Sequence, residues 1–87
     1  MENRNELNPT GRFTIELLAA NRYGVLNRIT SIYARRGYNI DSLKVGETDS
    51  PDVYRIVICS HGDEYARTQV VRQLSKLYDV TEVTLKC

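Results

Sequence analysis

The sequence predicts an α+β fold, in which a four-stranded antiparallel sheet carries two helices on one face. Runs of alternating apolar and polar residues indicate strands, and apolar residues at three- and four-residue spacing indicate helices. These patterns follow one another in the order strand, helix, strand, strand, helix, strand within 87 residues, a length that suits a single domain. Uncrossed, right-handed connections then favour a ferredoxin-like βαββαβ sandwich with strand order 4-1-3-2.

The chain is expected to begin with a tail and a first strand. Residues 1–11 are polar and predict a flexible N-terminal tail, which leaves residues 12–87 as the one folded domain. Apolar side chains alternate with their neighbours from Phe13 to Ala19. This alternation predicts a strand with one buried face.

A turn and a helix are predicted to follow this strand. The segment Asn21–Gly24 contains Asn and Gly, both of which favour turns. Apolar residues recur at helical spacing from Val25 to Tyr33, which predicts an amphipathic helix. Gly37 follows two arginines, as expected for a helix that ends in a left-handed glycine.

The next two strands are predicted to form a hairpin. The segment Tyr38–Val45 has polar residues on both faces, which indicates an edge strand or an interface strand. Simple alternation assigns its residues to two faces: Tyr38, Ile40 and Ser42 on one, and Asn39, Asp41, Leu43 and Val45 on the other. A turn at 48–52 leads into Val53–Cys59, whose β-branched residues predict a central strand.

The last part of the chain predicts a helix and a final strand. Asp63 is a suitable N-cap, with Glu64 in the first helical turn. Asp79 is predicted to close the helix, and Val80–Leu85 alternates as a strand. The apolar stripe of the helix is expected to comprise Val70, Val71, Leu74, Leu77 and Tyr78.

Charge and composition exclude several classes of partner. Twelve basic and eleven acidic residues give a net charge of +1, which argues against electrostatic binding to nucleic acid or to an anionic membrane. No apolar run approaches the ~20 residues that a membrane span needs. Phe13, Tyr54 and Arg55 do not make up the aromatic signature of an RNA-recognition motif. We therefore expect no nucleic-acid partner and no membrane partner.

Catalysis and metal binding find no support in the sequence. His61 is the one histidine, and Cys59 and Cys87 do not form a C-x-x-C pair, so a zinc site is not expected. Cys59 lies in an apolar run and is predicted to be a small buried hydrophobe. No set of nucleophile, base and orienting group can be assembled, so no catalytic residue, metal or cofactor is predicted. Two thiols without an export signal favour a cytoplasmic location.

The turn at Asn21–Leu26 suggests a small-molecule site. A strand that leads into a helix N-terminus exposes backbone N–H groups, which suit a carboxylate, and Gly24 permits close approach. Asn21 and Asn39 side-chain carbonyls would suit an ammonium group, and the apolar wall would come from Val25, Leu26 or Ile40. An amino acid carries these groups. On spacing alone, however, the better explanation is that these are ordinary turn and strand-start residues, because such turns are common.

Longer motifs add a resemblance to a known family. The segments Asn21–Ile29 (N-x-x-G-V-L-x-R-I) and Arg36–Leu43 (R-G-Y-N-I-D-S-L) resemble the ACT domain of the acetohydroxyacid synthase, or acetolactate synthase, regulatory small subunit. The later segment Gln73–Val83 fits the same family, and the likeness extends from about Phe13 to Leu85.

The resemblance implies a regulatory role rather than a catalytic one. In this family two ACT domains pair through an edge strand, and a feedback inhibitor such as valine or another branched-chain amino acid binds between them. The subunit modulates a large catalytic subunit that uses thiamine diphosphate, FAD and magnesium. Carried over to this chain, one protomer would contribute Asn21, Gly24, Val25 and Leu26, and its partner Asn39 and Ile40.

The sequence departs from the family pattern in two ways. Regulatory subunits commonly carry a second domain, whereas this sequence stops at Cys87, as a short form, a fragment or a stand-alone domain would. Arg22, Tyr23 and Asn27 also replace the acidic, small or proline residues usual in the turn. An alternative is therefore a dimerisation or protein-interaction module that binds no amino acid.

Overall fold

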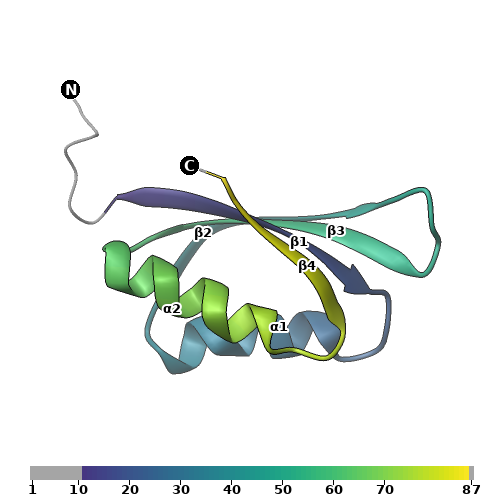
Figure 1. Ribbon diagram of the computed structural model, residues 1–87, viewed down its shortest axis with the longest axis horizontal. Helices are drawn as coiled ribbons and strands as arrows, with labels where there is room; N and C mark the ends of the chain where they lie inside the picture. The colour runs from purple at the N-terminus through teal and green to yellow at the C-terminus, as the bar shows by residue number, and fades with distance from the viewer. Residues whose placement is uncertain (1–10, 87) are drawn as a thin grey trace.

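Six elements occur in the predicted order in a computed structural model that describes residues 11–86 (Figure 1). They are β1 (Arg12–Ala20), α1 (Val25–Arg35), β2 (Asn39–Glu47), β3 (Val53–His61), α2 (Glu64–Ser75) and β4 (Val80–Lys86). Apart from Gly11, the predicted tail at residues 1–11 lies outside the described residues, as does Cys87.

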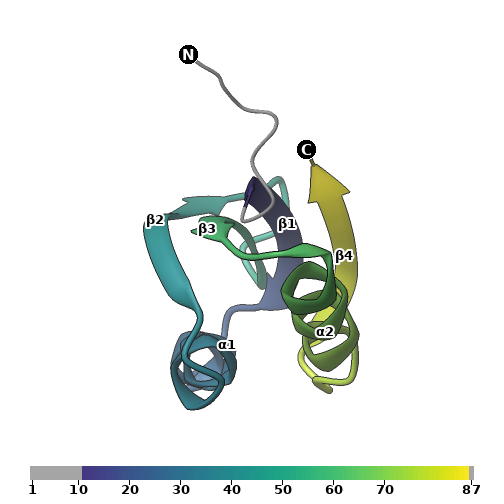
Figure 2. The same ribbon diagram turned by 90° about the vertical axis from the view of Figure 1, so that its left-hand side faces the viewer.

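The four strands form one antiparallel sheet in the order β2-β3-β1-β4, which is the predicted order read from the other edge. Both helices lie on the same side of the sheet, α1 toward the β2 edge and α2 toward the β4 edge (Figure 2). The ferredoxin-like βαββαβ sandwich is thereby confirmed. One sheet face packs against the helices, and the other face is open.

The core lies between the two central strands and the two helices. Alternate residues of β1 and β3 face the helices; alternation predicted β1, and β-rich composition predicted β3. The buried hydrophobic residues that pack together are Phe13, Ile15, Leu17, Ala19, Val25, Ile29, Ile32, Tyr33, Ile56, Ile58, Val70, Leu74 and Val80.

The predicted end of α1 and the predicted start of α2 have the expected chemistry. Gly37 has φ 72°, and it donates to the Ala34 carbonyl while Tyr38 donates to the Tyr33 carbonyl, a Schellman ending for α1. At the start of α2, the Asp63 carboxylate accepts a hydrogen bond of 2.8 Å from the Ala66 amide. Local residue chemistry therefore sets both boundaries.

Strand β2 differs from its prediction because it contains a β-bulge. Ile40 pairs with Ser60 and Ser42 pairs with Cys59, so Asp41 is an extra residue without a partner across the ladder. The extra residue reverses the alternation beyond it. Leu43 pairs with buried Ile58, and so the helix-side face of β2 contains Ile40, Leu43 and Val45 together. The predicted separation of Ile40 from Leu43 and Val45 was wrong.

The end of α2 also differs from its prediction. The helix ends at Ser75, and Tyr78 lies beyond it with 90% of its surface exposed, so Tyr78 is not part of the apolar stripe. Leu77 packs against the core from the loop. Asp79 does not close the helix but is buried just before β4, where its carbonyl accepts from the Ala20 amide at 2.8 Å.

Cys59 lies on the open face of the sheet rather than in the core. It is half-buried, and its thiol lies 3.0 Å from the Thr14 hydroxyl of β1. In β3 the core side belongs to Ile56, Ile58 and Ser60, so the neighbouring Cys59 must point the other way. The prediction of a buried thiol was therefore wrong, although His61 does end its strand as expected.

Candidate functional site

The turn before α1 exposes the start of the helix without a side-chain cap. Gly24 occupies the N-cap position with φ 85°, in the left-handed region that favours glycine. The Val25 amide donates to the Arg22 carbonyl at 3.2 Å, whereas the amides of Leu26 and Asn27 have no acceptor within residues 11–86. The first turn also holds no acidic side chain. This arrangement suits an anionic ligand group.

Two arginines that the sequence analysis did not select stand beside this turn. The Arg28 guanidinium donates a short hydrogen bond to the Asp79 carboxylate, and Arg22 lies 3.6 Å from the other Asp79 oxygen. Arg28 also lies close to Gly24. A Cβ atom built onto Gly24 would lie 3.7 Å from Nη1 of Arg28. The turn thus combines two cations and one buried anion, which adds positive potential at the helix start.

Asn21 is held in a defined orientation by the β2–β3 turn. Its backbone amide donates to the Asp52 carbonyl at 2.8 Å, and its side-chain Nδ2 donates to the Pro51 carbonyl at 3.4 Å. With the nitrogen side of the amide engaged, the side-chain carbonyl oxygen is directed away from Pro51. That oxygen is the group the sequence analysis assigned to an ammonium partner.

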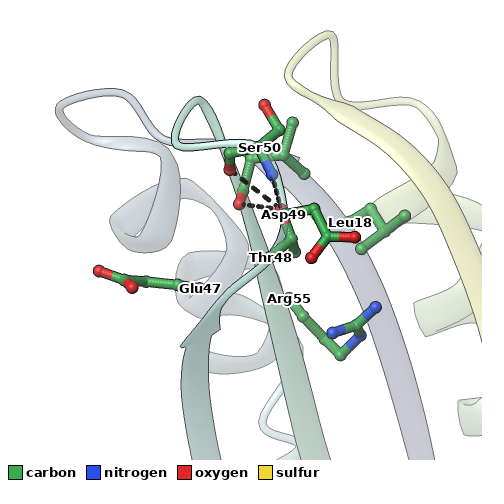
Figure 3. Close-up of a pocket in the computed structure, with 7 residues that line it drawn as sticks. Leu18, Glu47, Thr48, Asp49, Ser50 and Arg55 are labelled. Atoms are coloured by element: carbon green, nitrogen blue, oxygen red, sulfur yellow. Dashed lines mark hydrogen bonds between the residues drawn. The ribbon is translucent and has the colours of Figure 1, made fainter.

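A shallow groove lies beside the β2–β3 turn (Figure 3). Its lining includes Thr48, Asp49 and Arg55. The Thr48 hydroxyl accepts from the Ser50 amide at 3.1 Å and lies 2.8 Å from the Val53 carbonyl oxygen. These bonds fix the turn whose carbonyls in turn hold Asn21.

The predicted apolar wall is only partly available within one chain. Val25 packs in the core, so it contributes its backbone and not its side chain to the turn. Leu26 is exposed on α1, and Ile40 is half-buried on β2. The sequence pattern does not indicate that the side chain of Val25 is buried while that of Leu26 is exposed.

The predicted ligand residues form two groups in a single chain. Asn21 and Gly24 precede α1, whereas Asn39 and Ile40 follow it. Helix α1 has 11 residues and so spans about 16 Å, which places the groups at opposite ends of it. One chain therefore cannot close a single small site with all of them.

The described residues offer no other chemical centre. Within residues 11–86 there is no group of three or more His, Cys, Asp or Glu side chains placed to hold a metal ion. Over the same range, no helix is long and apolar enough to cross a membrane.

Comparison with protein families gives one match that spans most of the chain. The model for the acetohydroxyacid synthase small subunit-like ACT domain matches residues 15–82. This range includes most of β1, all of α1, β2, β3 and α2, and the first three residues of β4.

Curated relatives have consistent names. The chain is 45% identical over 71 residues to the acetolactate synthase small subunit of Bacillus subtilis, a match covering 80% of this chain and 41% of that protein. It is 41% identical over 73 residues to the isozyme 3 small subunit of Escherichia coli, covering 84% of this chain and 45% of that protein. The chain thus spans less than half the length of the curated relatives it matches.

Solved structures agree with this comparison. The acetolactate synthase small subunit of Thermotoga maritima superposes with a TM-score of 0.79 at 36% identity, covering 86% of this chain and 47% of that one. The ACT domain of a Chlorobium tepidum GTP pyrophosphokinase superposes with a TM-score of 0.74 over 88% of this chain and 99% of that one. At 17% identity the second likeness concerns the fold alone.

Proposed function

The chain belongs to the acetolactate synthase small-subunit family of ACT domains, and we propose that it binds a branched-chain amino acid between two copies of itself. Its relatives are named as acetolactate synthase small subunits, and we propose that the domain is regulatory and not itself catalytic. We propose valine or a similar aliphatic amino acid as the ligand. Binding would modulate a catalytic acetolactate synthase subunit in branched-chain amino acid biosynthesis.

The uncapped start of α1 is the observation on which the ligand proposal depends. Within residues 11–86 the Leu26 and Asn27 amides have no acceptor, and together with the neighbouring Arg28 guanidinium they suit the carboxylate of an amino acid. The Asn21 carbonyl oxygen suits its ammonium group. The exposed side chain of Leu26 suits an aliphatic side chain.

Strand β2 supports the proposal of a homodimer. It is a sheet edge of nine residues, and its helix-side residues Leu43 and Val45 are 37% and 43% exposed. An unpaired edge with apolar side chains is a template for pairing with another strand. A second copy of β2, added antiparallel, would extend the sheet to eight strands and cover these side chains.

Such pairing would bring the two separated groups of ligand residues together. In an antiparallel pair of β2 strands, the Asn39 end of one strand lies beside the Glu47 end of the other. The Glu47 end leads into the β2–β3 turn, which holds Asn21 through Pro51 and Asp52. Asn39 and Ile40 of one protomer would therefore approach the α1 turn of its partner.

Calorimetric titration with L-valine, L-leucine and L-isoleucine at millimolar concentration tests the ligand proposal. We expect binding by the unmodified chain and its loss in Gly24→Asp, which places a carboxylate against that of the ligand. Thr68→Asp is the control, because it adds a carboxylate at an exposed position of α2 that belongs to neither group of proposed ligand residues. Binding that survives Gly24→Asp would place the pocket elsewhere.

The catalytic partner needs a separate test. We propose that the domain acts in the cytoplasm on a large acetolactate synthase subunit, and we expect it to change that subunit's activity in a valine-dependent way. The measurement is acetolactate formation by a purified large subunit from the same organism, with and without this chain and L-valine. Activity that is the same in all mixtures would contradict the regulatory proposal.

The exposed β2 edge also supports the alternative of a dimerisation or protein-interaction module without an amino-acid ligand. The fully exposed Tyr23, next to Gly24 in the turn, favours this alternative because its bulk stands beside the proposed pocket. A stable dimer that gives no heat and no rise in melting temperature with any of the three amino acids would support it.

A further inference from the structure

The bulge in β2 lies directly beside the proposed ligand residues Asn39 and Ile40. Asn39 pairs with His61 and Ile40 pairs with Ser60, and then Asp41 is passed over in the ladder. Asp41 lies on the open face of the sheet together with His61, and its carboxylate contacts the imidazole of His61.

The Asp41 carboxylate is engaged at both oxygens. Oδ2 contacts Nδ1 of His61 and lies 4.0 Å from Nε of Arg12 on β1. Oδ1 accepts a hydrogen bond of 2.8 Å from Nδ2 of Asn39. The Asp41 side chain is 23% exposed, less than that of either cation-forming partner. Two strands thus fix the carboxylate, and the carboxylate fixes Asn39.

The hydrogen bond from Asn39 to Asp41 decides which side of the Asn39 amide is presented to a ligand. With Nδ2 turned to Asp41, the planar side chain directs its carbonyl oxygen to the opposite side. Asn21 has the same arrangement, since Pro51 engages its Nδ2. Both asparagines therefore present an acceptor, and an ammonium group needs acceptors.

We propose that Asp41, held by His61 and Arg12, is a positioning residue that presents the Asn39 carbonyl oxygen to the ammonium group of the amino acid. This inference rests on the proposed function of the site. It assigns an effect on ligand affinity to three residues that do not themselves touch the ligand.

A structural role for Asp41 would give a different result. Arg12 and His61 are 66% and 40% exposed, and ion pairs at such a surface contribute little to stability. Removal of the Asp41 carboxylate should therefore leave the melting temperature nearly unchanged. Ligand affinity should fall, because a freely rotating Asn39 amide presents its nitrogen as often as its oxygen.

The experiment compares calorimetric affinities for L-valine, L-leucine and L-isoleucine. We expect Asp41→Ala to weaken binding about tenfold, the effect of one hydrogen bond to a charged group, and Asp41→Glu to restore part of the loss. Glu82→Ala is the control, because it removes one carboxylate from the exposed surface of β4 at the other sheet edge. It should bind like the unmodified chain.

A double variant separates positioning from any direct effect of the Asp41 charge. If Asp41 acts through Asn39, then Asp41→Ala combined with Asn39→Ala should bind no more weakly than Asn39→Ala alone. The nitrogen-15 spectrum of the ligand-free chain gives a second measurement. One Asn39 side-chain proton should exchange slowly with water in the unmodified chain, and both should exchange rapidly in Asp41→Ala.

The outcomes distinguish this inference from the proposed function. If the unmodified chain binds none of the three amino acids, the proposed function and this inference both fail. If it binds one of them and Asp41→Ala binds equally well, only the role of Asp41 is refuted. Losses that add up fully in the double variant would also overturn it.

Discussion

Asp79 connects three parts of the chain through one residue. Its carbonyl accepts from Ala20 at the end of β1, and its buried carboxylate meets Arg28 of α1 and Arg22 of the preceding turn. A buried carboxylate is favourable only with such partners. The residue therefore fixes the turn that is proposed to bind the ligand.

Loss of the Asp79 charge should destabilise the domain. We expect Asp79→Asn to lower the free energy of unfolding by about 1–3 kcal/mol, because a buried, charge-assisted hydrogen bond to Arg28 is weakened. Urea denaturation measures the change. Asp49→Asn, at an exposed position in the β2–β3 turn, should stay within about 0.5 kcal/mol of the unmodified chain. Equal effects of the two substitutions would contradict this role.

The hydroxyl of Tyr33 is buried in the core without a hydrogen-bond partner among the described residues. The hydroxyls of Tyr33 and Ser60 are both buried without a hydrogen-bond partner within residues 11–86, and burial raises the pKa of Tyr33. A tyrosine with a raised pKa must stay protonated in the folded state. Keeping Tyr33 protonated has no extra cost below its ordinary pKa of 10.0, whereas the folded state loses stability as the pH rises above that value.

Replacement of this hydroxyl should be tolerated. We expect Tyr33→Phe to leave the free energy of unfolding unchanged or to raise it by up to about 1 kcal/mol, since a buried polar group without a partner is removed. The advantage should grow above pH 10.0, where the unmodified chain has the additional cost of keeping Tyr33 neutral. Urea denaturation at pH 7 and above pH 10 measures both effects, and a clear loss at neutral pH would contradict them.

At the scale of elements, the open face of the sheet is crossed by a row of charges. Glu16 of β1 contacts Lys86 of β4 at 3.3 Å and Arg55 of β3 at 2.9 Å. Hydrogen bonds and charge from Lys86, and then from Arg55, lower the pKa of Glu16, although partial desolvation opposes them. The row therefore ties three neighbouring strands together while Glu16 is ionised.

The stabilising effect of Glu16 should depend on pH. Because its pKa is lower in the folded state, its contribution is present above the ordinary value of 4.5 and disappears as the pH falls through the folded-state value. We expect Glu16→Gln to melt at a lower temperature than the unmodified chain at pH 7 in low salt. The difference should shrink on acidification and on addition of salt. A difference that is independent of both would contradict this interpretation.

Elements with one buried face could be predicted from the sequence, and those without it could not. In β1 the buried residues alternate strictly, so the strand and its faces were predicted correctly. In β2 almost every residue is exposed, and the bulge at Asp41 leaves no local pattern. Helix α2 stops at Ser75, although Leu77 and Tyr78 continue its spacing. The chain must turn there because Val80 pairs with Ala19.

The same distinction applies to the candidate site. The α1 turn was predicted because Asn and Gly favour turns through local backbone preferences, which the sequence alone reveals. The contact of Arg28 with Asp79 joins residues 51 positions apart, and no single-sequence pattern indicates it. The bond from Asn39 to Asp41 is local, but no pattern in the sequence indicates that these two polar side chains bond to each other.

At the scale of the whole molecule, the two edges of the sheet differ. Strand β2 is the longer edge, and its helix-side residues Leu43 and Val45 are 37% and 43% exposed although α1 lies toward this edge. Strand β4 is shorter, and α2 lies toward it and contacts it (Figure 2). An isolated domain with one uncovered edge is expected to associate through that edge. We therefore predict that the chain forms a homodimer and that the two copies meet at β2.

Charges placed on the uncovered face of β2 should separate the two copies. We expect Leu43→Lys combined with Val45→Lys to convert a dimer into a monomer at tens of micromolar, because two ammonium groups per chain would face each other across the two-fold axis. The melting temperature of the separated domain should change little, since both positions are already more than one-third exposed. Sedimentation velocity measures the mass.

A substitution at the other edge provides the comparison. Leu85 of β4 is 40% exposed, which matches Leu43 and Val45, so Leu85→Lys adds a charge at an equally accessible position. This variant should remain dimeric and should still bind the amino acid, whereas the β2 variant should lose both. If the β2 variant remains a dimer and Leu85→Lys dissociates, the copies meet at β4. The ligand site would then have to be completed within one chain, which the length of α1 does not allow.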